Sequence, residues 1–249
     1  MKKKEFVDDS LEKYWKGQRH IQRLATEYTT YLNKDLFRNI IQTTRFKIHP
    51  AICFSRNIGV GALELAEILG EKLGLPVADR EIIEHIAKTT QLSSKSIATF
   101  DERYPGKLKE LMCKILGDRE FDMTEYARHL FYVAFFLSHL ESTIFVGRGI
   151  HLMLPRKRVF AVRCISSRHR RIKNLSKSLD IEMKKAERIL EQADKEQQEF
   201  FHKIHGMDKA HSIEFDMVLN LDYIDDLKTA TDAIATLFQA KFPTTGNKN

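Results

Sequence analysis

The chain has 249 residues, of which 43% are hydrophobic and 30% are charged, and its net charge is +7. This composition is typical of a folded globular protein and excludes a wholly disordered chain. The three cysteines, Cys53, Cys113 and Cys164, are too widely spaced for a disulfide framework and indicate a reducing, cytoplasmic location. The longest apolar run, residues 130–137, is too short to cross a bilayer, so we expect no membrane span.

Residues 1–48 are rich in helix-forming residues, with apolar side chains mostly at three- and four-residue steps. This amphipathic pattern ends at Pro50, which predicts a helical N-terminal extension over residues 1–48. The extension has the pattern to cover the core, to pair with a second copy or a partner protein, or to lie on a surface.

Five short apolar runs then predict strands. Their apolar character is continuous and not alternating, which is typical of strands buried on both faces of a parallel sheet. The strands are expected at residues 51–55, 75–79, 143–149, 159–165 and 216–222. Helices are expected between them, at 62–73, 80–90, 105–117, 121–140, 168–178, 181–204 and 225–242, which favours an α/β layered domain over residues 49–243. Residues 244–249 should fray.

A glycine turn follows the first strand in the stretch "SRNIGVGALEL". Gly59 and Gly61 can adopt positive φ, and the helix that follows points its N–H groups back at the turn. The same glycines would also serve a purely structural tight turn. In a phosphate loop of the usual kind, Lys and Ser or Thr would occupy the positions of Ala62 and Leu63. Backbone groups alone would therefore hold an anion here, with Arg56 as the nearest cation.

The positive charge is concentrated in one part of the chain. Residues 156–188 contain 12 lysine and arginine residues against three acidic ones, a local excess of nine positive charges. This excess predicts a polyanionic partner, either nucleotide phosphates or a nucleic acid, although a solvated helix face would carry the same charges.

From Ile52 to Lys88 the sequence resembles the opening of the cytidylate kinase-like family, a divergent branch of the P-loop nucleoside monophosphate kinases. The matching residues are Ser55, Arg56, Gly59, Gly61, Asp79, Glu81, Ile82 and Ile83. Later segments match at Arg148, Arg171, Ile172, Asp194, Lys195, Phe200, Phe201 and Gly206. The resemblance implies a three-layer P-loop kinase-like fold, with a parallel five-stranded sheet in the order 2-3-1-4-5 and a helical lid at about residues 168–206. It also implies transfer of a phosphoryl group from ATP, with Mg²⁺, to a nucleotide or similar small phosphate acceptor.

The resemblance also implies roles for individual residues. The donor ATP would be held by Arg56, Asn57, Gly59, Val60, Gly61, Ala62 and Leu63. The acceptor would be held by Asp79, Arg80, Asp101 and Arg148, and the lid would contribute Arg171, Arg188 and Lys195 as catalytic cations. Because the basic segment coincides with this lid, a nucleotide is the expected partner and a nucleic acid is not.

Two of these residues have a second interpretation. Arg148 follows a strand and suits bidentate binding of phosphate, but an arginine there would also tie down a loop. Asp79 would orient Mg²⁺ through water or pair with an arginine, and it would equally serve as the N-cap of the next helix. The histidines at 202, 205 and 211 lack the spacing of a metal site, and we expect no protein metal centre.

Three positions depart from the family pattern. Leu63 replaces an arginine of the glycine turn, Gly149 replaces an aspartate that helps to read the base, and Gln197 replaces a lid arginine. A lost lid cation would slow phosphoryl transfer by orders of magnitude. The alternative function is therefore a catalytically degenerate protein that still binds a nucleotide.

Overall fold

The computed structural model describes residues 48–80, 83, 125–207 and 210–243. Four predicted features lie outside the described residues. They are residues 1–47 of the N-terminal extension predicted over 1–48, the helix at 105–117, nearly all of the helix at 80–90, and Asp101. Within the described part, no helix is both long enough and apolar enough to cross a membrane.

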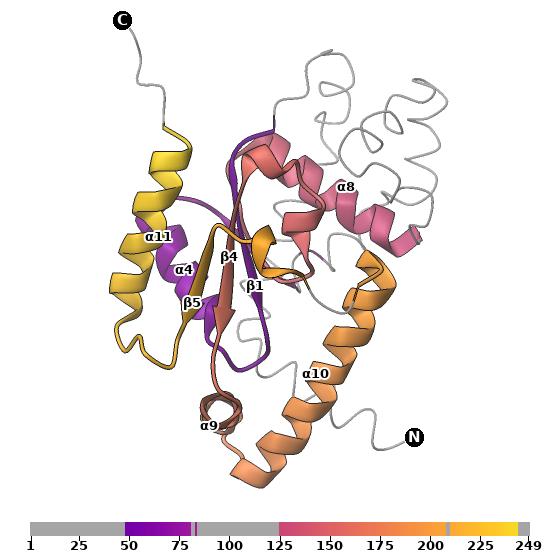
Figure 1. Cartoon of the computed structure of the whole chain (residues 1–249), viewed down its shortest axis with the longest axis vertical. Coiled ribbons are helices and arrows are strands. Elements are labelled where there is room, and N and C mark those ends of the chain that lie inside the picture. The colour runs from indigo at the N-terminus through magenta and orange to yellow at the C-terminus, as the bar shows by residue number, and fades with distance from the viewer. Residues whose placement is uncertain (1–47, 81–82, 84–124, 208–209, 244–249) are drawn as a thin grey trace, which may run out of the picture.

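The described residues form one five-stranded sheet in the order β2-β3-β1-β4-β5, and every neighbouring pair is parallel. This confirms the expected fold and strand order (Figure 1). All six residues of the central strand β1 are buried, which explains its continuous apolar sequence. The strands are β1 Ala51–Arg56, β2 Val77–Ala78, β3 Ile144–Val146, β4 Val159–Ile165 and β5 Met217–Asn220.

Helices cover both faces of the sheet and complete three layers (Figure 1). Helices α4 (Ala62–Leu73) and α11 (Leu227–Lys241) pack on one face, and α8 (Glu125–Leu140) packs on the other. Helices α9 (Arg168–Leu179) and α10 (Met183–His205) follow β4 and pack against each other at a steep angle, as the α9–α10 pair (Figure 1). Three short 3₁₀ turns, which the sequence did not predict, are η3 Ile150–Leu152, η4 Arg156–Arg158 and η5 Ser212–Glu214.

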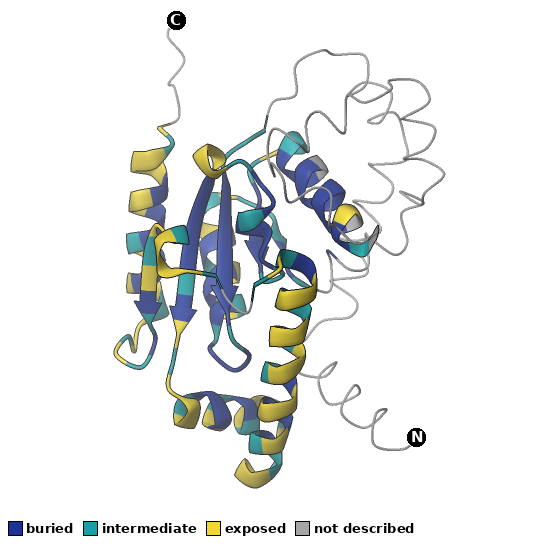
Figure 2. Cartoon of the chain, turned by 45° about the vertical axis from the view of Figure 1, so that its right-hand side comes forward, coloured by how far each residue is buried: buried dark blue, intermediate teal, exposed yellow. Residues whose placement is uncertain are grey.

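Alternation along the strands divides the core into two clusters. Ile52 and Phe54 face α4 and α11, whereas Ala51 and Cys53 face α8. A third, smaller hydrophobic cluster joins the α9–α10 pair to Ile58. Figure 2 shows the buried strands between helices whose outer faces are exposed. The α9–α10 pair is therefore packed, through apolar contacts, against the loop that follows β1.

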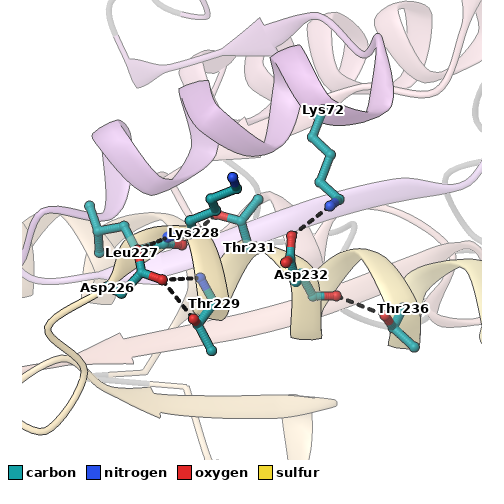
Figure 3. Close-up of polar contacts among 8 residues, drawn as sticks. All are labelled: Lys72, Asp226, Leu227, Lys228, Thr229, Thr231, Asp232 and Thr236. Carbon is teal, nitrogen blue, oxygen red and sulfur yellow. Dashed lines mark hydrogen bonds and ion pairs between the residues drawn. The ribbon is translucent and has the colours of Figure 1, made fainter.

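Helix α11 begins at Leu227, two residues later than predicted, because Asp226 caps it. The Asp226 carboxylate accepts hydrogen bonds from the backbone N–H groups of Lys228 and Thr229 at 3.0 and 3.1 Å (Figure 3). Such a cap satisfies donors of the first turn that have no partner within the helix. The Lys72–Asp232 ion pair, also drawn in Figure 3, links α4 to α11. Because it is exposed to solvent, it contributes little to the stability of the fold.

Strand β3 is shorter than the predicted 143–149. It ends at Val146 because the next three residues, Gly147, Arg148 and Gly149, all have positive φ, at 92°, 55° and 66°. Left-handed backbone cannot continue a strand, so the chain turns away from the sheet here. This turn places Arg148 beside the carboxyl end of β1.

Candidate functional site

A cleft with a volume of about 500 Å³ lies at the carboxyl ends of β1 and β3. One wall comes from the residues at the end of β1 and from the turn after β3, and the opposite wall comes from α10. Its lining residues include Ser55, Arg56, Asn57, Ile58, Arg80, Gly147, Arg148, Gly149, Arg163, Asp194, Glu196, Gln197, Phe200 and Phe201. In open parallel sheets, ligands bind at this edge.

Four arginines from four different segments line the cleft: Arg56, Arg80, Arg148 and Arg163. The structure thus brings together the predicted Arg56, Asn57, Arg80 and Arg148. Arg163 was not predicted as a site residue. The available signal was a charged residue within the otherwise apolar strand β4, "VFAVRCI".

Arg148 is held in an unusual position. The Nε2–H of His205 donates to its backbone carbonyl at 3.0 Å, and its guanidinium carbon lies 3.8 Å from the centre of the Phe200 ring. Burial, followed by the positive charges of Arg80 and Arg56, lowers the pKa of Arg148 to about 8. A buried positive charge beside two others is stabilised by any anion that enters the cleft.

Gly149 has a physical reason of its own to be glycine. A Cβ added there would lie 2.3 Å from Nε2 of His205, and the backbone φ is +66°. The imidazole of His205 therefore occupies the space that an aspartate side chain would need. An aspartate at position 149 would therefore need both a strained backbone conformation and a different position of the His205 imidazole.

The glycine loop, residues 57–61, connects β1 to α4. Both glycines have positive φ, 78° at Gly59 and 90° at Gly61, and the N-terminus of α4 has no side-chain cap. A Cβ at Gly61 would meet open space, whereas a Cβ at Gly59 would lie 2.7 Å from the carbonyl oxygen of Arg171. The structural partner that closely approaches Gly59 is therefore helix α9 of the same chain.

The remaining predicted donor residues do not line the cleft. Val60 and Ala62, the first residue of α4, are buried in the core, and the partly buried Leu63 packs against that core. Neither Gly59 nor Gly61 is among the described residues that line the cleft. Any contact between this part of the loop and a ligand would come from backbone groups.

Arg171 supports the glycine loop. It is 8% exposed, its Nε–H donates to the carbonyl of Ile58 at 2.7 Å, and it pairs with Asp194 at 2.5 Å. Asn174 adds a hydrogen bond to the carbonyl of Gly59 at 2.9 Å. Side chains of helix α9 thus hold the glycine loop through hydrogen bonds to two of its carbonyl groups.

The structure does not bring the three predicted catalytic cations, Arg171, Arg188 and Lys195, into the described lining of the cleft. Arg188 is exposed, and Lys195 is exposed with Glu199 3.9 Å away. Their catalytic role stays a prediction. At the lid position that lacks an arginine, the amide of Gln197 donates to the carbonyl of Arg56 at 2.8 Å.

Asp79 is 3% exposed and follows β2. Its carbonyl accepts from the N–H of Ile83 at 3.1 Å, so a helical turn begins here. His202 and His211 are exposed, and His205 binds Arg148. Among the described residues, no group of three or more His, Cys, Asp or Glu side chains is placed to hold a metal ion.

Comparisons with known proteins agree with this architecture. A model described as the cytidylate kinase-like family matches residues 51–223. A search of curated proteins found no match. The crystal structure of an uncharacterized protein from Eubacterium ventriosum is similar, with a TM-score of 0.56 and 17% identity over 77% of this chain and 99% of that one.

Two kinase structures also match, at lower TM-scores. A shikimate kinase from Bacteroides thetaiotaomicron has 16% identity over 76% of this chain and 98% of its own, with a TM-score of 0.40. A dephospho-CoA kinase from Campylobacter jejuni has 15% identity over 78% of this chain and 98% of its own, with a TM-score of 0.34. Since the family model covers residues 51–223 and the sheet has the order 2-3-1-4-5, the chain belongs to the cytidylate kinase-like family and has a P-loop kinase-like fold.

Proposed function

We propose that the protein transfers a phosphoryl group from ATP to a nucleotide or another small acceptor that carries a phosphate. The observation that carries the proposal is the convergence of four arginines on one cleft, at the edge of the sheet where the glycine loop begins. Phosphoryl transfer needs little covalent chemistry from the protein, because positioning and neutralisation of negative charge supply most of the catalysis.

The electrostatics of the cleft support an anionic ligand. Of the two carboxylates in the lining, Asp194 is already paired with Arg171, and Glu196 accepts a hydrogen bond from Gln192. Among the described residues, neither carboxylate is paired with a cleft arginine. A phosphate ester would offset this positive charge and bind two guanidinium groups in bidentate fashion.

The residues present fit ATP better than they fit a protein-held metal. The open, left-handed Gly61 and the uncapped start of α4 can direct backbone N–H groups to a phosphate. ATP would supply the phosphoryl group. Leu63 has no hydroxyl for a metal, so Mg²⁺ would be held mainly by phosphate oxygens and water. Asp79 is the carboxylate that we predict to orient it through water.

A second function has its own support. Ala62, at the position of the usual phosphate-loop lysine, is buried in the core, and Gln197 is bound to the Arg56 carbonyl. Both positions therefore lack the cation that would stabilise the transferring group. These observations favour a protein that binds a nucleotide without turning it over.

One pair of measurements separates the two functions. Titration calorimetry with ATP, with and without Mg²⁺, measures binding, and a coupled assay over CMP, dCMP, UMP and AMP measures transfer. Binding with turnover supports the kinase, whereas binding with no turnover of any acceptor supports the second function. Arg148→Gln should lower kcat/KM by about tenfold or more, whereas Arg158→Gln, an exposed arginine outside the cleft lining, should change it by less than about twofold.

A further inference from the structure

Arg163 differs from the other arginines of the basic segment. It lies in β4 directly beside Ser55 of β1, on the sheet face that it shares with Val159 and Ala161. Its two terminal nitrogens donate to neutral oxygens, the hydroxyl of Ser55 at 2.7 Å and the side-chain carbonyl of Asn57 at 2.9 Å. The guanidinium therefore sits where β1 passes into the glycine loop.

The charge on Arg163 has no acidic partner among the described residues. Three other arginines of the segment are paired, Arg156 with Asp216, Arg168 with Glu187 and Glu191, and Arg171 with Asp194. Unlike the exposed Arg158 and Arg188, Arg163 is partly buried and lines the cleft. Burial lowers the pKa of Arg163, and the positive charge of Arg171 adds to this effect. An arginine in this setting is stabilised by an anion that approaches from the cleft side.

The glycine loop, in turn, lacks a cation. Ala62 is buried where a phosphate loop usually has lysine, and residues 57–61 contain no charged side chain. The guanidinium of Arg163 contacts the first residue of this loop, Asn57, and lines the cleft. The missing charge and the unpaired charge thus meet at one place in the fold.

We propose that Arg163 is a phosphate-binding residue that supplies, from β4, the cation that the glycine loop lacks. It would bind a phosphate of a nucleoside polyphosphate where the loop opens into the cleft. This inference rests on the proposed binding of ATP, but it concerns recognition and does not require turnover. An arginine that only positioned Asn57 would make the same two hydrogen bonds. In that case, removing Asn57 would weaken ATP binding as much as removing Arg163.

The test is calorimetric titration of the full chain with ATP and, separately, with inorganic pyrophosphate. Arg163→Gln should weaken binding of both by about tenfold or more, and Arg163→Lys should recover part of the loss because the charge remains without the planar fork. Asn57→Ala should weaken binding less than Arg163→Gln. The exposed Arg158→Gln serves as the matched control and should bind within about twofold of the wild type.

Several results would overturn the inference. Unchanged ATP and pyrophosphate affinity in folded Arg163→Gln would do so, as would equal losses in Asn57→Ala and Arg163→Gln with no recovery in Arg163→Lys. A wild-type chain that binds neither probe would reject both this inference and the proposed function. A wild-type chain that binds ATP but does not turn it over would reject only the kinase activity, and the inference about Arg163 would then be decided by the binding data of the variants. A circular dichroism melt of each variant establishes that it is folded.

Discussion

The two glycines of the loop provide a sharp test of how α9 packs on it. Gly59 and Gly61 both have positive φ, so alanine at either position costs about 1–2 kcal/mol of backbone strain. At Gly61 an added Cβ meets nothing within 4 Å, and the strain is the whole effect. Gly61→Ala is therefore the matched control for Gly59→Ala.

At Gly59 the added Cβ would lie 2.7 Å from the carbonyl oxygen of Arg171. Because that atom belongs to the backbone of α9, no side-chain rotation relieves the contact, and the helix must retreat by several tenths of an ångström. The movement stretches the hydrogen bonds from Arg171 to Ile58 and from Asn174 to Gly59, each of which contributes about 0.5–1.5 kcal/mol. Gly59→Ala should therefore lose about 2–5 kcal/mol in total.

Thermal unfolding measures this difference directly. The two hydrogen bonds make the expected difference between the variants about 1–3 kcal/mol. For a chain of this length, each kcal/mol lowers the melting temperature by about 2–4 °C, so Gly59→Ala should melt about 2–12 °C below Gly61→Ala. Urea unfolding of the two variants should rank them in the same order. Equal losses in the two variants would refute the packing of α9 against the loop.

Three further predictions concern other parts of the molecule. Burial acts to raise the pKa of Asp216, but hydrogen bonds from Arg156, Lys241 and the Ala161 N–H outweigh it and hold the pKa below its usual value. Asp216→Asn should therefore be less stable than the wild type at pH 7, by about 1–3 kcal/mol, and the difference measured by urea unfolding should shrink as the pH falls below about 4; a constant difference would contradict the ion pairs. Gly149→Asp should lower the melting temperature without creating CMP kinase activity, and adding His205→Ala should recover part of the loss if the imidazole is the obstacle. Burial raises the pKa of the Cys53 thiol and raises that of Cys164 to about 12, so peptide mapping should find neither alkylated in the native protein at pH 8 and both alkylated after unfolding.

Local sequence determined the elements whose limits depend on neighbouring residues. Helix α4 spans the predicted 62–73, between Gly61 and Gly74, which both adopt left-handed backbone at its ends. Strand β4 also has its predicted limits, 159–165, because it is an apolar run, interrupted only by Arg163, between Pro155 and the Ser167 cap of α9. The parallel sheet follows from such buried runs alternating with helices.

Local sequence failed where left-handed residues interrupt an apolar pattern. The run from Thr143 to Gly149 looks like one strand, yet the sheet pairing ends at Val146. Three successive residues with positive φ turn the chain there, and an arginine gives no local indication of that conformation. The position of Arg148 in the cleft depends on this turn.

The cleft itself was decided by contacts between segments far apart in the chain. The sequence predicted Arg56, Asn57, Arg80 and Arg148 as site residues, and these four line the cleft. It did not show that Arg163 reaches Ser55 and Asn57 across more than a hundred residues. The sequence also gave no sign that Arg171 donates to the loop carbonyl of Ile58 while Lys195 faces solvent. These orientations depend on how the α9–α10 pair packs against the end of the sheet. The sequence alone determined the glycine turn and the residue types from which we propose a phosphate site, because those are local properties. Only the tertiary structure decided which charges meet in the cleft, because strand pairing and helix docking set the distances between them.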